Sequence, residues 1–345
     1  MSADALGAAV RQLAFGESLS AEAAHAAFDV VMRGEASVAQ IAALLIALRI
    51  KGETPAEVAG AARALRSAMV PLVADRPNEL VDTCGTGGGR VSTFNISTAA
   101  ALLAAGAGVR VAKHGNRSFT SSSGSADVLE ALGVTIETPV AVMQRALSEA
   151  GIVFMFAPLM HPAMRHVGPV RRELAVPTVM NIVGPLANPA SAGRQVVGVA
   201  EAARMPLIAR ALAELGTEHA LVVHGAPGLD EISPLGATQV MEVRGGAVHE
   251  WVIEPDAYLE RPVSAQELAG GDPATNARTI LAVLGGEGPA GAEAAVVLNA
   301  AAALYVAGRT PDFASGVEAA RRALQAGQGL AALERLRRAT APAEA

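Results

Sequence analysis

Apolar residues recur at helical spacing through the first seventy residues of the chain. One apolar face follows a predicted capping box that starts at Ser37. This face is formed by Ile41, Leu44, Leu45 and Leu48. Further helix starts are expected at Ser20 and at Thr54, and the helix after Ser20 should end near Gly34. Several helices with short connections and no strand signal predict a small helical domain.

Beyond residue 80, short apolar runs alternate with helical stretches. The runs of strand length are 80–83, 109–112, 152–156, 196–200 and 220–224. The helical stretches include 97–105, 125–132 and 140–150. This alternation predicts an α/β domain with a mostly parallel central sheet. Two further runs, 239–244 and 247–253, flank Gly245-Gly246 and predict a hairpin.

The last third of the chain returns to a helical pattern. A capping box at Ser264 to Glu267 is expected to open one of its helices, and the tail after Arg338 is expected to fray. The chain of 345 residues is long enough for two domains.

Composition narrows the class of protein. Hydrophobic residues make up 51% of the chain and the net charge is −6, which argues against disorder. The pI of about 5.7 and the lack of a Lys/Arg block argue against a nucleic-acid partner of the ordinary basic kind. A single cysteine, Cys84, excludes an internal disulfide framework. With no membrane or targeting segment evident, a cytoplasmic protein without membrane contact is expected.

The first segment with chemical potential runs from Asp82 to Gly89 and is rich in glycine. Glycines let backbone N–H groups approach a phosphate, and a helix opened by Asn95 to Thr98 would add its N-terminal dipole. The segment matches neither a Walker loop nor the spaced dinucleotide fingerprint. An ordinary glycine-rich turn remains the alternative.

Two more loops follow predicted strands. Lys113 to Arg117 and the hydroxyl-rich run from Ser118 to Ser125 suit an anionic, hydroxylated ligand. Asp230 and Glu231 are hard oxygen ligands of the kind that Mg²⁺ prefers. A solvated basic loop and a solvated acidic turn are the respective alternatives, and taken alone each alternative is favoured.

A fourth segment contains His161 and, farther on, Arg171 and Arg172. An arginine can bind a carboxylate with two hydrogen bonds, although an exposed helix arginine is the simpler interpretation. No metal-binding histidine pattern is present, so zinc is not expected. Because loops after parallel strands gather at one edge of the sheet, the residues alone predict an Mg²⁺-dependent enzyme acting on a phosphorylated or pyrophosphorylated metabolite.

Several segments, in this order, resemble the anthranilate phosphoribosyltransferases over nearly the whole chain. The residues that carry the resemblance are 85–88, 93–98, 113–117, 123–127, 161–163, 170–173, 184–189 and 229–233. The resemblance implies that anthranilate displaces pyrophosphate from 5-phosphoribosyl 1-pyrophosphate (PRPP). It also implies a fold of the nucleoside phosphorylase and phosphoribosyltransferase type, a homodimer, and a cleft between two domains. The small helical domain would comprise residues 1–70 and about 163–190, and the large α/β domain 71–162 and 191–345.

Roles for individual residues also come from the resemblance. PRPP would be bound by Gly85, Gly88, Gly89, Thr93, Asn95, Ile96, Ser97, Thr98, Lys113, Asn116, Ser121 and Ser125. Anthranilate would be bound by Gly85, His114, Asn116, His161, Arg171 and Pro185. Two Mg²⁺ ions would be held by Ser97, Asp230 and Glu231. His114 is also a tentative general base.

The sequence departs from the family pattern at two places. Gly89-Arg90 stands where the family commonly has Asp-Gly, and Ser122 stands where a basic residue is frequent. We expect the first change to alter Mg²⁺ dependence and to reduce inhibition by PRPP. A pyrimidine nucleoside phosphorylase-like enzyme and a non-catalytic relative that binds nucleic acid are the alternative functions. The acidic net charge, and the presence of both the glycine loop and the acidic pair, favour the transferase.

Overall fold

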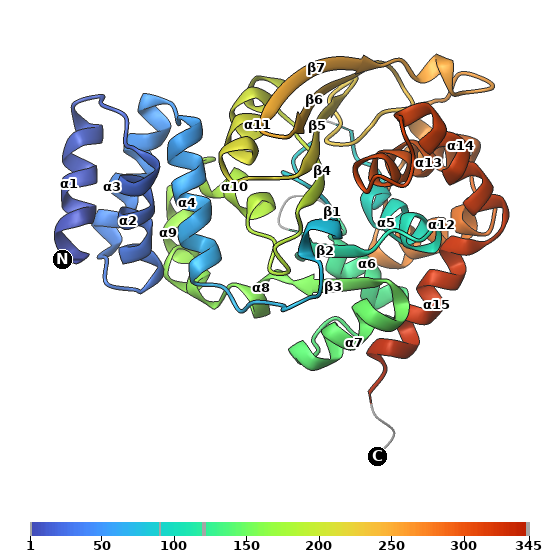
Figure 1. The fold of residues 1–345 in the computed structure, drawn as a ribbon, viewed down its shortest axis with the longest axis horizontal. Helices are drawn as coiled ribbons and strands as arrows, with labels where there is room; N and C mark the ends of the chain where they lie inside the picture. Colours follow the sequence, from blue (N-terminus) through green and yellow to red (C-terminus); the bar gives the residue numbers. More distant parts are fainter. Residues whose placement is uncertain (1, 90, 119–121, 343–345) are drawn as a thin grey trace.

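A bundle of helices lies at one end of the molecule and an α/β layer structure occupies the rest (Figure 1). The computed structural model describes residues 2–89, 91–118 and 122–342. Within these residues, no helix has the length and apolar character needed to cross a membrane.

The N-terminal helices begin where the sequence predicts. Their bounds are α1 (Ser2–Ala14), α2 (Ala21–Met32), α3 (Val38–Lys51) and α4 (Pro55–Ser67). Ser20, Ser37 and Thr54 each accept a hydrogen bond from the backbone N–H three residues on, so the expected caps are confirmed. The Glu57 carboxylate is fully buried and accepts hydrogen bonds from the backbone of Leu19 and from Lys51. These bonds tie the helices together.

A seven-stranded sheet forms the centre of the α/β part, in the order β3-β2-β1-β4-β5-β6-β7. The strands β1 to β5 are parallel, and β6 and β7 form the predicted antiparallel hairpin at one edge. Their bounds are β1 (Val81–Gly85), β2 (Val111–Gly115), β3 (Ile152–Phe156), β4 (Arg194–Gly198), β5 (His219–Gly225), β6 (Thr238–Arg244) and β7 (Ala247–Ile253). The predicted fold class, a small helical domain with a mostly parallel sheet, is confirmed.

The first two strands reach farther than the apolar runs indicate. The structure continues β2 through Gly115, so Lys113 and His114 belong to the strand and not to the loop after it. They pair with Phe154 and Met155 of β3. The sequence prediction was wrong here because the ladder with β3 maintains the extended backbone after the apolar side chains end.

Helices cover both faces of the sheet. Those packed into the larger core, or bounding it, are α5 (Ile96–Gly106), α6 (Ser125–Ala131), α7 (Val140–Ala150), α12 (Pro273–Leu284), α13 (Ala290–Val306), α14 (Phe313–Gln325) and α15 (Gln328–Thr340). The opposite face packs against α11 (Met205–Glu214). In α5 and α13 apolar residues are buried on nearly all sides, as expected for helices enclosed by protein.

A segment from the middle of the chain packs against the N-terminal helices. It contains α9 (Gly168–Leu174) and α10 (Met180–Val183), whereas the preceding α8 (Ala157–Met160) packs against β3. Val167, Val170 and Ile182 share a buried cluster with residues of α2, α3 and α4. The same cluster continues into Val197 of β4 and Val222 of β5, so the bundle and the sheet share one apolar interior.

Two predictions for the C-terminal third were wrong in detail. The capping box at Ser264 opens a single 3₁₀ turn, Ala265–Leu268, while the next α-helix begins at Pro273 behind the cap Asp272. The chain after Arg338 stays helical through Thr340, and residues 343–345 of the tail that we expected to fray lie outside the described residues. The Thr340 hydroxyl is buried and donates to the carbonyl of Leu336, which holds this last turn in place.

Candidate functional site

The chemically active segments meet at the carboxyl edge of the parallel strands. The glycine loop follows β1, Asn116 follows β2, and the segment with Asp230 and Glu231 follows β5. Ligands of open α/β sheets bind at this edge. The sequence predicted that these loops gather at one edge of the sheet, and the structure places them there.

The glycine loop is joined to Asp230. The Gly87 N–H donates to Asp230 Oδ2 over 3.0 Å. Gly87 and Gly88 have φ angles of +69° and +82°, which favour glycine. A Cβ atom at Gly85 would lie 2.8 Å from Asp230 Oδ2, and one at Gly89 would lie 3.1 Å from Asp230 Oδ1. The loop backbone therefore passes directly over the carboxylate.

The start of α5 is joined to the second carboxylate in the same way. The Ser97 N–H donates to Glu231 Oε1 over 3.1 Å. Asn95 takes the N-cap position, but its side chain bonds elsewhere: the amide donates to the carbonyl of Ser123 over 3.0 Å. Ile96 and Thr98 bury their side chains in the protein interior. Their backbone, together with Ser97, forms the helix N-terminus, which attracts anions.

A buried lysine lies beneath these loops. Lys113 is 3% exposed, and its ammonium donates to the carbonyl of Thr83 and to Ser97 Oγ, the latter over 3.3 Å. On β1, Asp82 is fully buried and accepts from the His114 N–H over 3.1 Å and from Asn188 Nδ2 over 2.7 Å. The ends of β1 and β2 thus share a network of charged groups with little access to water.

Dehydration dominates the electrostatics of this network. It raises the pKa of Asp82 to about 6 despite Lys113 and the Asn188 amide, which favour the charged form. Burial, reinforced by the neighbouring Asp230, raises the pKa of Glu231 well above its usual value. Burial also raises the pKa of Asp230, and it lowers the pKa of Lys113. A cation bound beside these buried carboxylates would therefore stabilise their charged forms.

Two histidines face one another beside this network. The ring centroids of His114 and His161 are 4.9 Å apart. Burial, with a smaller effect of His161 and Lys113, lowers the pKa of His114 to about 3, and burial lowers that of His161 to about 4. Both rings are neutral at pH 7. Among the described residues, His114 Nε2 has no hydrogen-bond partner. The backbone of Ala187 lies near His161 and partly offsets the lowering of the His161 pKa.

Other residues expected near the histidines are placed less closely. The Pro185 carbonyl accepts from Gln195 and lies 3.9 Å from the Cys84 sulfur, beside β1. Arg171 lies on α9, and burial lowers its pKa. Its guanidinium makes no hydrogen bond or ion pair within the residues that the structure describes. The structure thus brings the histidines together and records no contact between them and Arg171.

The segment after β2 is closed by Asp127. Its carboxylate accepts from the N–H groups of Ser118, over 3.1 Å, and of Gly124, over 2.8 Å. Asn116 and Ser125 meet where Ser125 Oγ lies 3.4 Å from the Asn116 carbonyl. Ser121, expected to bind PRPP, lies outside the described residues, as does Arg90.

The two remaining expected positions contact a more distant part of the chain. Thr93 forms a backbone bridge with Ala269. Ser122 donates its hydroxyl to the carbonyl of Gly271 over 2.7 Å. The Ser122 hydroxyl therefore connects the segment after β2 to the segment before α12.

The donor set fits a magnesium ion only in part. Asp230 and Glu231, with the Ser97 hydroxyl nearby, supply hard oxygen atoms suited to Mg²⁺. No group of three or more His, Cys, Asp or Glu side chains able to hold a metal is found in residues 2–89, 91–118 and 122–342. Mg²⁺ commonly binds through one or two carboxylates completed by substrate phosphates and waters. These residues suit that arrangement.

Several residues that build the site carry no chemistry and were missed from the sequence. A Cβ atom at Gly198 would lie 1.6 Å from the Asp230 carbonyl oxygen, and one at Gly225 would lie 2.5 Å from that of Glu231. The last residues of β4 and β5 must therefore be glycine for the acidic segment to fold over them. A glycine that ends an apolar strand was the available signal.

The buried asparagines among the described residues hold the loops from behind. They are Asn188, Asn276 and Asn299, each at most 3% exposed. Asn276 Nδ2 donates to Asn95 Oδ1 over 2.9 Å, and its Oδ1 accepts from the Gly271 N–H over 2.7 Å. A lone asparagine in an apolar helical run was the signal for Asn299.

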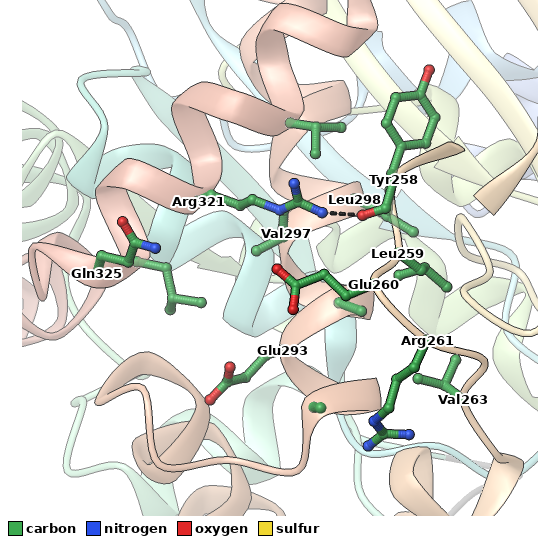
Figure 2. A pocket seen from close by; sticks show the side chains of 14 residues that line it. Tyr258, Leu259, Glu260, Arg261, Val263, Glu293, Val297, Leu298, Arg321 and Gln325 are labelled. Carbon is green, nitrogen blue, oxygen red and sulfur yellow. Dashed lines mark hydrogen bonds between the residues drawn. The ribbon is translucent and has the colours of Figure 1, made fainter. Parts of the chain in front are cut away.

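A larger cavity lies apart from all these residues. It has a volume of about 470 Å³ between the segment after β7 and the helices α13 and α14, and none of the expected site residues lines it. Figure 2 shows Arg321 donating to the Tyr258 carbonyl across this cavity, with Glu260 and Glu293 nearby. Its size alone does not make it the site of the chemistry.

Comparison with known proteins places the chain among characterised relatives. Residues 8–69 match the helical bundle domain, and residues 77–330 the a/b domain, of the glycosyl transferase family. The chain is 51% identical to an anthranilate phosphoribosyltransferase of Rubrobacter xylanophilus, over 95% of each chain.

Solved structures agree with this similarity. A crystal structure of anthranilate phosphoribosyltransferase from Thermus thermophilus superposes with a TM-score of 0.90 at 44% identity, covering 96% of this chain and 99% of that one. The Saccharomyces cerevisiae enzyme in complex with PRPP and Mg superposes with a TM-score of 0.87 at 26% identity, covering 98% of each.

We predict that Gly198→Ala dislodges the acidic segment. The added Cβ has no room beside the Asp230 carbonyl, so backbone must move, at a cost of about 1–3 kcal/mol or more. The melting temperature should fall by several degrees, and hydrogen exchange should accelerate in residues 226–234. Gly7→Ala on α1, where the added Cβ meets only the end of a flexible arginine at 3.4 Å, should not lower the melting temperature. A melting temperature for Gly198→Ala equal to that of the unmodified protein would contradict the close contact.

We predict that Glu231→Gln stabilises the free protein increasingly as pH rises. A carboxyl whose pKa is raised on folding favours the folded state below its unfolded pKa, and this contribution is lost as pH rises through the folded pKa. The glutamine amide does not titrate, so its contribution to the unfolding free energy stays constant over this pH range. The difference in unfolding free energy between variant and parent should grow by about 1–3 kcal/mol from pH 5 to pH 9, since one pKa unit corresponds to about 1.4 kcal/mol. Denaturant titrations measure it, and Glu250→Gln, at an exposed position on β7, is the control. Parallel curves for the two variants would refute the prediction.

Proposed function

The chain belongs to the anthranilate phosphoribosyltransferases of the glycosyl transferase family, and from its own geometry we propose how its residues divide between the two substrates. The enzyme transfers the phosphoribosyl group from PRPP to the amine of anthranilate and releases pyrophosphate, a step of tryptophan biosynthesis. The relatives favour this activity over the nucleoside phosphorylase and nucleic-acid-binding alternatives.

The observation that carries the proposal is the pairing of two backbone N–H groups with two carboxylates. Gly87 and Ser97 donate to Asp230 and Glu231 at 3.0 and 3.1 Å. A strand-end glycine loop and a helix N-terminus are suited to phosphate oxygens, and the carboxylates beside them are suited to the metal that accompanies a pyrophosphate. The residues proposed to bind PRPP are Gly85, Gly88, Gly89, Thr93, Asn95, Ile96, Ser97, Thr98, Lys113, Asn116, Ser121 and Ser125.

We assign Mg²⁺ to the same edge. Ser97 with Glu231 would hold one ion, and Asp230 with Glu231 a second. When bound, Mg²⁺ lowers the free energy of the charge that builds on the leaving pyrophosphate. Beneath it, Lys113 contributes a fixed positive charge through Ser97, and its burial strengthens that interaction because little water screens it.

The neutral histidine pair is the proposed floor of the anthranilate site. The unpartnered Nε2 of His114, with the neighbouring His161 ring, can donate to or accept from the carboxylate and amine of anthranilate. A pKa of about 3 makes His114 a weak proton acceptor at pH 7, so we propose it as a binding residue and do not retain it as a general base. Arg171 would grip the anthranilate carboxylate, and Pro185, Asn116 and Gly85 would complete the site.

These roles account for the transfer without a strong base. The bond between ribose C1 and the pyrophosphate oxygen breaks as positive charge develops on the ribose, and the neutral amine of anthranilate forms the new bond to C1. The amine proton then passes to water or to the released pyrophosphate. The N-terminus of α5 would stabilise the departing group, as would the Mg²⁺ that Asp230 and Glu231 would hold. Correct placement of a weak, uncharged nucleophile supplies the rest.

We propose the expected domain division, homodimer and location on separate grounds. The small domain would join residues 1–70 to about 163–190, because α9 packs against α3 and α10 packs against α4. Phe15, directly after α1, is 84% exposed, and Val38 and Ile50, at the two ends of α3, are 59% and 81% exposed. Helix α1 lies at the outer end of the bundle (Figure 1). A second copy packed against α1 and α3 would remove apolar surface from water. A cytoplasmic location agrees with the metabolic role. The effect of Gly89 on Mg²⁺ dependence stays a prediction.

The direct test follows anthranilate fluorescence with purified protein, PRPP and Mg²⁺. Signal should fall only when both additions are present. We expect Arg171→Ala to raise the KM for anthranilate at least tenfold, because a charge-assisted bond contributes about 1.5–3 kcal/mol. Glu231→Ala should abolish turnover. The neighbouring Arg172→Ala is the matched control for Arg171, since it removes an exposed arginine from the same helix. Equal effects of the two arginine variants would contradict the role of Arg171.

A further inference from the structure

Asn299 is a polar residue in the middle of the apolar helix α13. Its side chain is 3% exposed, and its neighbours Leu298 and Ala300 are likewise buried. It belongs to none of the loops that carry the chemistry. Yet α13 packs beneath β1, β4 and β5, whose ends carry the glycine loop and the acidic segment.

The Asn299 amide is paired with the backbone of a single residue on the acidic segment. Its Oδ1 accepts from the Ile232 N–H over 3.0 Å, and its Nδ2 donates to the Ile232 carbonyl over 2.9 Å. The second Nδ2 proton goes to the Ala295 carbonyl, also over 2.9 Å. One side chain thus fixes both polar groups of Ile232 and stays fixed to its own helix.

Ile232 directly follows Glu231. The Ile232 N–H belongs to the peptide plane shared with Glu231, and the Ile232 C=O belongs to the plane shared with Ser233. Holding both groups fixes the backbone on either side of Ile232, and the first of these planes sets the direction of the Glu231 side chain. A cavity of about 10 Å³ is lined by Asn299, Glu231, Ser97 and Gly198, so Asn299 lies close to the second carboxylate. Its three hydrogen bonds go to Ile232 and Ala295, so Asn299 acts on Glu231 through the backbone.

Other contacts hold the segment only at its ends. Leu229 forms a backbone bridge with Gly225, and the Ser233 N–H donates to Thr238 Oγ1 over 3.0 Å. Between these anchors lie the two carboxylates and Ile232. Among the described residues, two kinds of hydrogen bond hold this middle part. The two carboxylates accept from Gly87 and Ser97, and the Asn299 amide of α13 holds the backbone of Ile232.

We propose that Asn299 is a positioning residue that holds Asp230 and Glu231 in the orientation needed to bind the metal of the PRPP complex. This inference rests on the proposed function of that pair. Asn299 acts through Ile232 and touches neither substrate. Its loss should weaken metal binding and leave anthranilate binding unchanged.

The test compares Asn299→Leu with the parent protein by Mn²⁺ binding in the presence of PRPP, followed by electron paramagnetic resonance of the free ion. Leucine keeps the branching at Cγ, is somewhat larger than asparagine, and removes all three hydrogen bonds. Mn²⁺ affinity should fall about tenfold, the lower end of the range for residues that orient metal ligands. The Mg²⁺ concentration for half-maximal turnover should rise in parallel, with the KM for anthranilate unchanged.

Leu304→Ala is the matched control, because it creates a cavity in the same buried helix away from the acidic segment. It should lower the melting temperature and leave Mn²⁺ affinity unchanged. If Asn299→Leu does not fold, Asn299→Ser replaces it with the same expected loss of affinity. Unchanged Mn²⁺ affinity in a folded Asn299 variant, or an equal loss in Leu304→Ala, overturns the inference while parent turnover upholds the proposed function. A parent protein that neither binds Mn²⁺ with PRPP nor consumes anthranilate overturns both.

Discussion

The close passage of the acidic segment over the ends of β4 and β5 is the constraint on which the rest of the site depends. Gly198 and Gly225 leave room for the backbone of Asp230 and Glu231, and no larger residue could. This position brings both carboxylates under the N–H groups of Gly87 and Ser97. With larger residues in place of these two glycines, the acidic segment could not approach the glycine loop and the start of α5.

Burying the charged groups of this site away from water has an electrostatic cost. Hydrogen bonds offset this cost more fully for some of the groups than for others. Lys113 donates to Thr83 and Ser97, and Asp82 accepts from Asn188 and the backbone of His114. The charges of Asp230 and Glu231 are the least compensated, since burial and mutual repulsion both raise the pKa of Glu231. Such strain, concentrated in the groups that would meet a metal, is typical of a functional site. Buried polar residues on α12, on α13 and at Asn188 keep the strained loops in place.

Much of this architecture follows from local sequence patterns. Ser20, Ser37 and Thr54 cap helices as expected, and the hairpin at Gly245-Gly246 lies where the turn signal places it. These features depend on neighbours in the chain. The gathering of the strand-end loops was also predictable, because parallel strands present their carboxyl ends together.

The sequence was less informative where distant segments decide the outcome. It did not predict that β2 continues through Lys113 and His114, since pairing with β3 extends that strand. The supporting role of Gly198 depends on its contact with Asp230, and that of Asn299 depends on its hydrogen bonds with Ile232. In both cases the two partners are far apart along the chain. The low pKa of His114 depends on burial and on His161, which no local pattern reveals.

We propose that this protein presents an incomplete metal site that PRPP completes. Mn²⁺ binding, measured with and without PRPP on the parent and on Glu231→Gln, tests this proposal most directly. We predict weak binding by the protein alone, tight binding once PRPP is present, and loss of that gain in Glu231→Gln. Equally tight Mn²⁺ binding without PRPP, or a gain that survives in Glu231→Gln, would contradict it.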